Sequence, residues 1–102
     1  MQVPHAQVTN RINARVGEPF NIVLDGNATT PYRWRLDFGQ DKLRLMNEQY
    51  IGEEGGGVGA GGTYVFTFVP VAPGRATLRA SYTDGAGTRV SARHEFYLDI
   101  QS

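Results

Sequence analysis

Hydrophobic and polar residues alternate with a period of two along most of the chain. The clearest apolar positions are Phe20, Ile22 and Leu24; Tyr32, Trp34, Leu36 and Phe38; Tyr64, Phe66 and Phe68; Ala76, Leu78, Ala80 and Tyr82; and Val90, Ala92, His94, Phe96, Leu98 and Ile100. This alternation is typical of β-strands that bury one face and expose the other. No segment keeps a helical period over a useful length, so the pattern predicts an all-β protein.

Turn signals divide the chain into seven expected strands. We expect these at about 5–16, 20–24, 32–38, 42–51, 63–69, 75–83 and from 88 onward, with a bulge near Asn47 in the fourth. Seven short strands with turns between them are typical of an immunoglobulin-like antiparallel β-sandwich. The sequence thus predicts one such domain spanning residues 1–102, a length at which a real core can be buried without metals or disulfides.

The order of the connections predicts which loops are neighbours. Consecutive strands in such a sandwich mostly reverse direction, so alternate connections gather at one end. Connections 25–31, 52–62 and 84–87 are expected at one end, and connections 17–19, 39–41 and 70–74 at the other. Two loops of unusual composition, far apart in sequence, are therefore expected side by side.

The first unusual loop contains Asn27, Ala28, Thr29, Thr30 and Pro31. Its hydroxyls and backbone groups could hydrogen-bond a partner, although Asn, Thr and Pro are also common in ordinary polar turns. Pro31 fixes its own φ and restricts Thr30. It could therefore pre-organise this loop.

The second unusual loop is the glycine-rich run 55–62. It contains G-x-G-x-x-G at 57–62, but a dinucleotide fingerprint needs a helix after the glycines, and here an expected strand follows. Two interpretations stay open: a flexible connector, or a segment whose backbone closely approaches a partner.

The two loops resemble recognition segments of the chagasin-type inhibitors of papain-like cysteine peptidases. That family has an Asn-Pro-Thr-Thr-Gly loop before an aromatic-x-Trp strand, and here Asn27, Thr29, Thr30 and Trp34 match while Ala28 and Pro31 depart. Its Gly-x-Gly-Gly loop is matched by Gly59, Ala60, Gly61 and Gly62, and the stretch 72–82 resembles its corner and the strand ending in Tyr. The family's third segment, Arg-Pro-aromatic, is absent, since Tyr82 is followed by Thr83, Asp84, Gly85, Ala86 and Gly87.

The resemblance implies a reversible inhibitor that blocks the cleft of a papain-like cysteine peptidase with loops 26–31, 53–62 and 84–87. The expected peptidase-binding residues are Asn27, Ala28, Thr29, Thr30, Pro31, Gly59, Ala60, Gly61, Gly62, Asp84, Gly85 and Ala86. Because aromatic and Arg side chains usually dominate interface energetics, their loss from the third loop leaves an alternative open. In that alternative the chain is a general protein-binding or adhesive module that does not inhibit peptidases.

Composition and motifs limit which other functions and partners the chain can have. Ten basic and ten acidic residues cancel, which disfavours nucleic acid or an anionic membrane as partner, and the absence of Cys excludes a catalytic thiol and disulfides. No nucleophile elbow, H-E-x-x-H motif or metal-spaced cluster is present, so we expect neither an enzyme nor a metal or cofactor site.

Trp34 and Tyr82 are expected in the framework and His94 as a half-buried strand residue. We further expect a monomer, secreted or periplasmic, whose signal peptide is not part of this chain.

Overall fold

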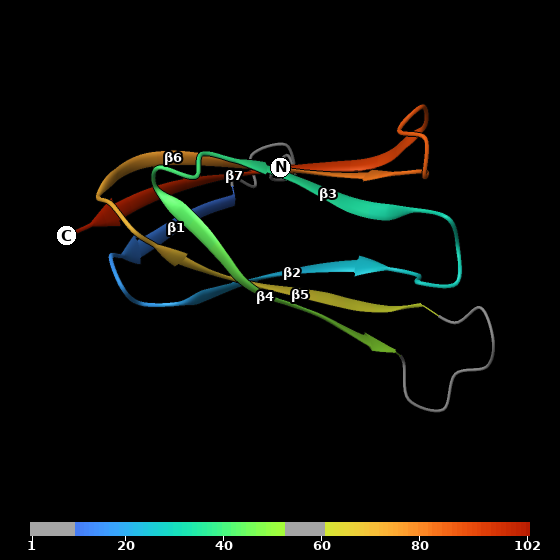
Figure 1. Cartoon of the computed structure of the whole chain (residues 1–102), viewed down its shortest axis with the longest axis horizontal. Helices are drawn as coiled ribbons and strands as arrows, with labels where there is room; N and C mark the ends of the chain where they lie inside the picture. The colour runs from blue at the N-terminus through green and yellow to red at the C-terminus, as the bar shows by residue number, and fades with distance from the viewer. Residues whose placement is uncertain (1–9, 53–60) are drawn as a thin grey trace, which may run out of the picture.

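The computed structural model describes residues 10–52 and 61–102, which form two β-sheets packed face to face (Figure 1). The strands are β1 (Asn10–Arg15), β2 (Phe20–Gly26), β3 (Arg33–Phe38), β4 (Leu43–Gly52), β5 (Gly62–Pro70), β6 (Gly74–Thr83) and β7 (Val90–Gln101). One sheet has the order β1-β7-β6-β3, and the other has the order β2-β5-β4. The predicted all-β sandwich of seven strands is confirmed.

The predicted strand positions agree closely with these bounds. The bulge expected near Asn47 is present, because the β4–β5 register shifts between Leu45 and Asn47. Residues 5–9, the beginning of the first predicted strand, lie outside the described residues.

One strand pair differs from the antiparallel expectation. β1 runs parallel to β7, with Asn10 opposite Phe96 and Arg15 opposite Gln101. The other four pairs are antiparallel. The difference follows from strand parity: the first and seventh strands of an alternating chain point the same way, so they are parallel wherever they are neighbours.

The core lies between the sheets and consists of the inward-facing residues of the alternating runs. It contains Ile22, Leu24, Leu43, Tyr64, Phe66, Phe68, Leu78, Ala80, Leu98 and Ile100. Phe68 is fully buried at its centre, stacked on Phe20 and edge-on to Phe38, with ring centroids 5.9 Å and 5.0 Å away. Aromatic pairs in this geometry add to the free energy of burial.

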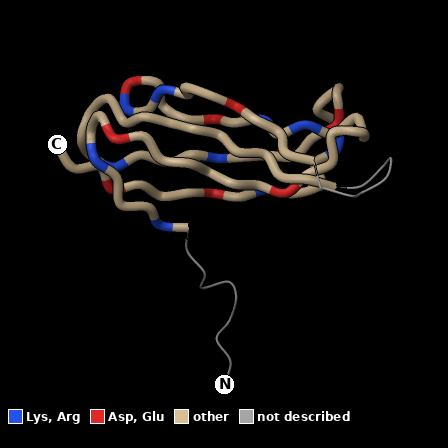
Figure 2. Tube along the Cα trace, turned by 90° about the horizontal axis from the view of Figure 1, so that it is seen from below, with Lys and Arg blue, Asp and Glu red and all other residues tan. Residues whose placement is uncertain are grey.

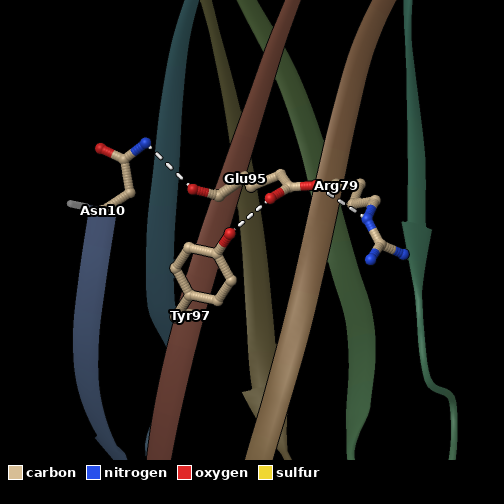
Figure 3. A network of polar contacts seen from close by, with 4 residues as sticks. All are labelled: Asn10, Arg79, Glu95 and Tyr97. Atoms are coloured by element: carbon tan, nitrogen blue, oxygen red, sulfur yellow. Dashed lines mark hydrogen bonds and ion pairs between the residues drawn. The ribbon is translucent and has the colours of Figure 1, made fainter. Parts of the chain in front are cut away.

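The outer face of the four-stranded sheet is polar, and side-chain contacts join three of its strands (Figure 3). The Glu95 carboxylate on β7 accepts hydrogen bonds from Arg79 on β6, at 2.9 Å, and from the Tyr97 hydroxyl. The Asn10 amide on β1 donates to the Glu95 backbone oxygen at 3.0 Å. The bonds from the Tyr97 hydroxyl and from Arg79 hold the pKa of the Glu95 carboxyl below its ordinary value, and the bond to Glu95 raises the pKa of Tyr97.

The Phe68→Ala substitution should lower the free energy of unfolding by about 3–5 kcal/mol, because it removes a buried ring and leaves a cavity. Val23→Ala, at a side chain that is 59% exposed, should change it by less than about 0.5 kcal/mol. Chemical denaturation monitored by tryptophan fluorescence measures both. Equal effects would show that Phe68 does not lie in the core.

Candidate functional site

Three connections meet at one end of the sandwich, as predicted from their order (Figure 1). Gly26 at the end of β2 is paired with Gly62 at the start of β5, and Gly62 is paired with Gly52 at the end of β4. Arg33 at the start of β3 is paired with Thr83, where the β6–β7 hairpin begins. We call this end, formed by residues 26–32, 52, 61–62 and 83–90, the loop end. The predicted residues Gly59 and Ala60, with the rest of 53–60, lie outside the described residues.

The opposite end holds the other three connections, also as predicted. The Gly17 amide donates to the Pro70 carbonyl oxygen at 3.0 Å, and the Val71 amide donates to the Lys42 carbonyl oxygen at 2.8 Å. These bonds tie together the connections after β1, β3 and β5. The two sets of loops are therefore at opposite ends of the long sandwich.

Asn27 organises the loop between β2 and β3. Its side-chain oxygen accepts hydrogen bonds from the Thr29 amide at 3.0 Å and from the Thr29 hydroxyl at 2.6 Å. Its backbone oxygen accepts from the Thr30 amide at 3.2 Å and from the Thr30 hydroxyl at 2.8 Å. This is the Asx-turn chemistry that allows Asn to shape a tight turn.

The second half of the loop is closed by Thr30 and Arg33. The Thr30 hydroxyl also accepts from the Tyr32 amide at 3.2 Å, across Pro31, which has no amide hydrogen to offer. The Arg33 guanidinium donates to the carbonyl oxygens of Thr30 and Tyr32, both at 2.6 Å. Both threonine hydroxyls that were expected to face a partner are thus already bonded within the loop. What the loop presents outward includes the exposed Thr29 and Pro31.

Two side chains of the four-stranded sheet, Tyr82 and Trp34, join this loop region to the other sheet by hydrogen bonds. The Tyr82 hydroxyl, from β6, accepts from the Asn27 amide at 2.8 Å and donates to the Asn27 carbonyl oxygen at 3.3 Å. The Trp34 indole N–H, from β3, donates to the Asp25 carbonyl oxygen at 3.0 Å. The Trp34 and Tyr82 rings lie against each other, with centroids 4.8 Å apart. The loop is therefore fixed to both sheets.

The glycines next to this loop have different reasons to be glycine. A Cβ on Gly62 would lie 2.5 Å from the Ile51 carbonyl oxygen, and one on Gly26 would lie 2.5 Å from the Tyr64 ring. Among the described residues, a Cβ on Gly61 would meet the Gly26 carbonyl oxygen alone, at an ordinary 3.5 Å. Packing within the chain thus requires glycine at two of these positions and leaves position 61 free of that requirement.

Because these glycines carry no side chains, the loop end of the three-stranded sheet has a hollow. Its volume is about 460 Å³, and it is lined by Asp25, Gly26, Ile51, Gly52, Gly61, Gly62 and Thr63. Because Gly26, Gly52, Gly61 and Gly62 lie in this lining, the surface offers few side chains. A partner can approach the backbone closely here.

The third predicted segment is a tight hairpin organised by Asp84. Its carboxylate accepts from the Thr88 amide at 2.9 Å, the Thr88 hydroxyl at 3.0 Å and the Arg89 amide at 3.3 Å. Desolvation raises the pKa of this carboxyl, but the bonds from Arg89 and Thr88 outweigh it and hold the pKa below its ordinary value. Gly87 has φ +75°, which suits glycine, and Gly85 and Ala86 are exposed at the tip.

The framework residues are placed largely as expected. Trp34 is partly buried against the core, and Tyr82 is half-buried. The expectation for His94 is wrong, because its side chain is exposed. One side of its ring still contacts Trp34, with centroids 5.7 Å apart.

Sequence reasoning missed the polar contacts that hold the first loop. Alternation put Tyr82 and Trp34 on inward faces, but only the register that pairs them across β3 and β6 shows that the Tyr82 hydroxyl reaches Asn27. The role of Arg33 as a donor to two loop carbonyls had no sequence signal. Knowledge that the third and sixth strands pair would have been needed to predict these contacts.

Within residues 10–52 and 61–102, no group of three or more His, Asp or Glu side chains could hold a metal ion. The same ranges contain no helix that is long and apolar enough to cross a membrane. The site is therefore described by shape, backbone and hydrogen bonds.

Comparison with known proteins identifies the family. The family model described as the chagasin family peptidase inhibitor I42 matches residues 13–100. The chain belongs to this family. Its members are peptidase inhibitors, so the chagasin-type resemblance and the expectation that the chain is not an enzyme are both confirmed. A search of curated proteins found no match.

Solved structures share the fold of this chagasin-family chain. The cysteine protease inhibitor EhICP2 from Entamoeba histolytica has a TM-score of 0.80 at 18% identity, covering 95% of this chain and 91% of that one. Amebosin has a TM-score of 0.70 at 23% identity, covering 89% and 88%. PbICP-C, solved in complex with falcipain-2, has a TM-score of 0.66 at 18% identity, covering 91% of each chain. At these identities the likeness shows a common sandwich fold.

The Tyr82→Phe substitution should loosen the first loop while keeping the ring contacts. It removes both bonds to Asn27, so the free energy of unfolding should fall by about 0.5–1.5 kcal/mol and the Asn27 amide should exchange faster with deuterium. Hydrogen exchange followed by NMR measures this.

Tyr32→Phe is the matched control, because Tyr32 stacks on Tyr82, with centroids 5.5 Å apart, while the bonds to Asn27 come from Tyr82. It should leave the Asn27 amide protected. Unchanged exchange in the Tyr82 variant would show that the loop is held by other contacts.

Proposed function

We propose that this chagasin-family chain is a reversible inhibitor of papain-like cysteine peptidases that blocks the active-site cleft with loops 26–31, 53–62 and 84–87. The observation that carries the proposal is the rigid 27–32 loop, held by Asn27 and Tyr82 and placed next to two other connections. The PbICP-C structure, in which a protein of the same fold is bound to falcipain-2, supports a peptidase as partner.

Blocking a cleft requires shape, and the described residues supply it. A loop with its polar groups already bonded loses little conformational freedom on binding, so little of the interaction free energy is lost in ordering it. Its outward surface, with the exposed Thr29 and Pro31, is small enough to enter a groove. The Gly61 backbone beside it leaves room for a cleft wall to approach.

The hairpin at 84–89 contributes differently. Its exposed tip is formed by Gly85 and Ala86, which offer little contact area, and its carboxylate is turned into the hairpin by bonds to Thr88 and Arg89. We therefore expect the first two loops to supply most of the close contact, with the hairpin flanking them. The match to a family of peptidase inhibitors favours inhibition over the general binding module, and the titration below tests this directly.

Titration of a papain-like peptidase with the chain should give reversible inhibition, and the inhibitor should be recovered uncleaved from the complex. Thr29→Asp should weaken inhibition at least about tenfold, because it places an uncompensated charge in a desolvated cleft. Residual peptidase activity on a fluorogenic substrate measures both inhibition constants. Absence of inhibition by the unmodified chain would establish the binding-module alternative.

Thr29→Val is the uncharged control, because valine keeps the branched side chain, replaces the hydroxyl by a methyl group and loses the same bond to Asn27 that Thr29→Asp loses. It should inhibit more strongly than Thr29→Asp, and thermal melts should show that both variants are folded. Equal inhibition by Thr29→Asp and the unmodified chain would remove the first loop from the contact.

A pair of neighbouring glycines separates binding from folding. Gly61→Ala should leave the melting temperature unchanged within about 2 °C, since a Cβ fits there, yet it should weaken inhibition by obstructing backbone contact with the cleft wall. Gly62→Ala should lower the melting temperature by several degrees, because its Cβ would lie 2.5 Å from the Ile51 carbonyl oxygen. Calorimetry and titration measure the two effects. Full inhibition by Gly61→Ala would contradict the proposed role of this backbone.

A further inference from the structure

Four arginines surround the side of the loop end that belongs to the four-stranded sheet. Arg33 and Arg35 are two residues apart on β3, so they share its outer face. Arg35 is opposite Ser81 on β6, which is opposite Arg93 on β7, so Arg35 and Arg93 lie in one row across the sheet. Arg89 belongs to the hairpin that β6 and β7 form. We call Arg33, Arg35, Arg89 and Arg93 the arginine cluster.

The hairpin and β3 approach each other closely enough to bring these charges together. A Cβ on Gly87 would lie 3.9 Å from a guanidinium nitrogen of Arg35, so Arg35 extends toward the hairpin. Arg33 is paired with Thr83, directly before Asp84. All four arginines are exposed. Figure 2 shows basic segments at this end of the molecule, opposite the C-terminus.

No ion pair among the described residues involves the arginine cluster. Three of the four ion pairs found there, Arg15–Glu18, Lys42–Asp41 and Arg75–Asp99, lie toward the opposite end. The fourth, Arg79–Glu95, lies midway along the sheet. Among residues 10–52 and 61–102, the ion-paired cations thus lie away from the loop end, and the arginine cluster has no carboxylate partner.

The described carboxylates near the cluster are bonded elsewhere, lie in the other sheet or lie one row further from the loop end, as Asp37 does opposite Arg79. Asp84 is bonded to the amides of its own hairpin, and Glu95 is bonded to Arg79 and Tyr97 (Figure 3). Asp25 belongs to β2, in the three-stranded sheet. Glu53 and Glu54 lie outside the described residues. Although the formal net charge is zero, four arginines on one side of the loop end have no ion pair with a described carboxylate.

We propose that the arginine cluster docks on a carboxylate-bearing surface beside the peptidase cleft and steers the inhibitor into the cleft. The inference rests on the proposed function, because it makes the cluster the flank of the same contact surface. The cluster is continuous with loop 27–32, since Arg33 itself donates to the carbonyl oxygens of Thr30 and Tyr32. Arginine side chains keep their charge at any working pH, so the cluster attracts carboxylates throughout the assay range.

Attraction between the arginine cluster and acidic groups of the peptidase acts before the two proteins come into close contact. Complementary surface charge mainly raises the association rate and makes it depend on salt, while release depends on the close contacts of the loops. The cluster should thus favour peptidases whose cleft rim is acidic. Specificity among papain-like peptidases would then come from this flank.

The experiment compares association rates by surface-binding kinetics on two papain-like peptidases of opposite net charge at the assay pH. The unmodified chain should associate faster with the acidic enzyme, and this rate should fall steeply between 50 and about 500 mM NaCl. The double variant Arg35→Gln, Arg93→Gln should associate about three- to tenfold more slowly at low salt and lose most of the salt dependence. Its dissociation rate should change less than twofold.

Two controls keep the result specific. Arg44→Gln removes an exposed arginine of β4 at the opposite end, which also has no ion pair among the described residues, and it should associate as the unmodified chain does. Arg35→Lys with Arg93→Lys keeps the charges and should retain the fast, salt-dependent association. Thermal melts confirm that each variant is folded.

The outcomes are distinguishable. If the unmodified chain binds and the Gln double variant associates at the same rate with the same salt dependence, the arginine cluster has no steering role and the proposed inhibition stands. If Arg44→Gln slows association as much as the double variant does, overall charge rather than this surface is responsible, and the inference is overturned. If the unmodified chain binds no papain-like peptidase, both the proposed function and the inference are overturned.

Discussion

The hydroxyl of Tyr82 makes the contact on which the loop end depends. It accepts from the amide of Asn27 and donates to the carbonyl oxygen of the same residue, so one side chain of the four-stranded sheet satisfies both backbone groups of a residue that follows the three-stranded sheet. The indole of Trp34 makes a second bond between the sheets, to the Asp25 carbonyl oxygen. With these bonds in place, the internal contacts of Asn27, Thr29 and Thr30 determine a single loop shape.

A fixed loop shape is what a protein needs if it is to block a cleft without reacting. Ordering a flexible segment during binding would reduce affinity, whereas this loop is ordered by the fold itself. The glycines at 26 and 62 serve the same purpose indirectly, because they let Tyr64 and Tyr50 pack beneath the ends of the strands. Residues that support the fold and residues proposed to contact a peptidase are thus neighbours in the chain. Packing within the described residues requires glycine at position 62 and does not require it at position 61.

Alternation and turn residues were sufficient to predict the sandwich, the seven strands and the bulge near Asn47. Strand parity was sufficient to predict which loops gather at one end, and also accounts for the parallel pairing of β1 with β7 that the antiparallel expectation did not include. The side-chain contacts of Tyr82 and Arg33 could not be predicted, since they depend on which strands pair across the sheets and in which register. The exposure of His94 could not be predicted either, because alternation gives a side chain its face of the sheet and leaves open what packs over that face.

The bulge in β4 has a consequence for how the protein behaves in concentrated solution. β4 is an edge strand of ten residues, and Met46 beside the bulge is 57% exposed and Leu45 37% exposed. A long, regular edge with apolar side chains is a template on which a second molecule can add a strand and begin aggregation. The register shift between Leu45 and Asn47 interrupts the row of free backbone donors and acceptors, so a second copy cannot pair along the whole edge. An irregularity of one residue thereby helps keep the molecules separate while their loops remain available.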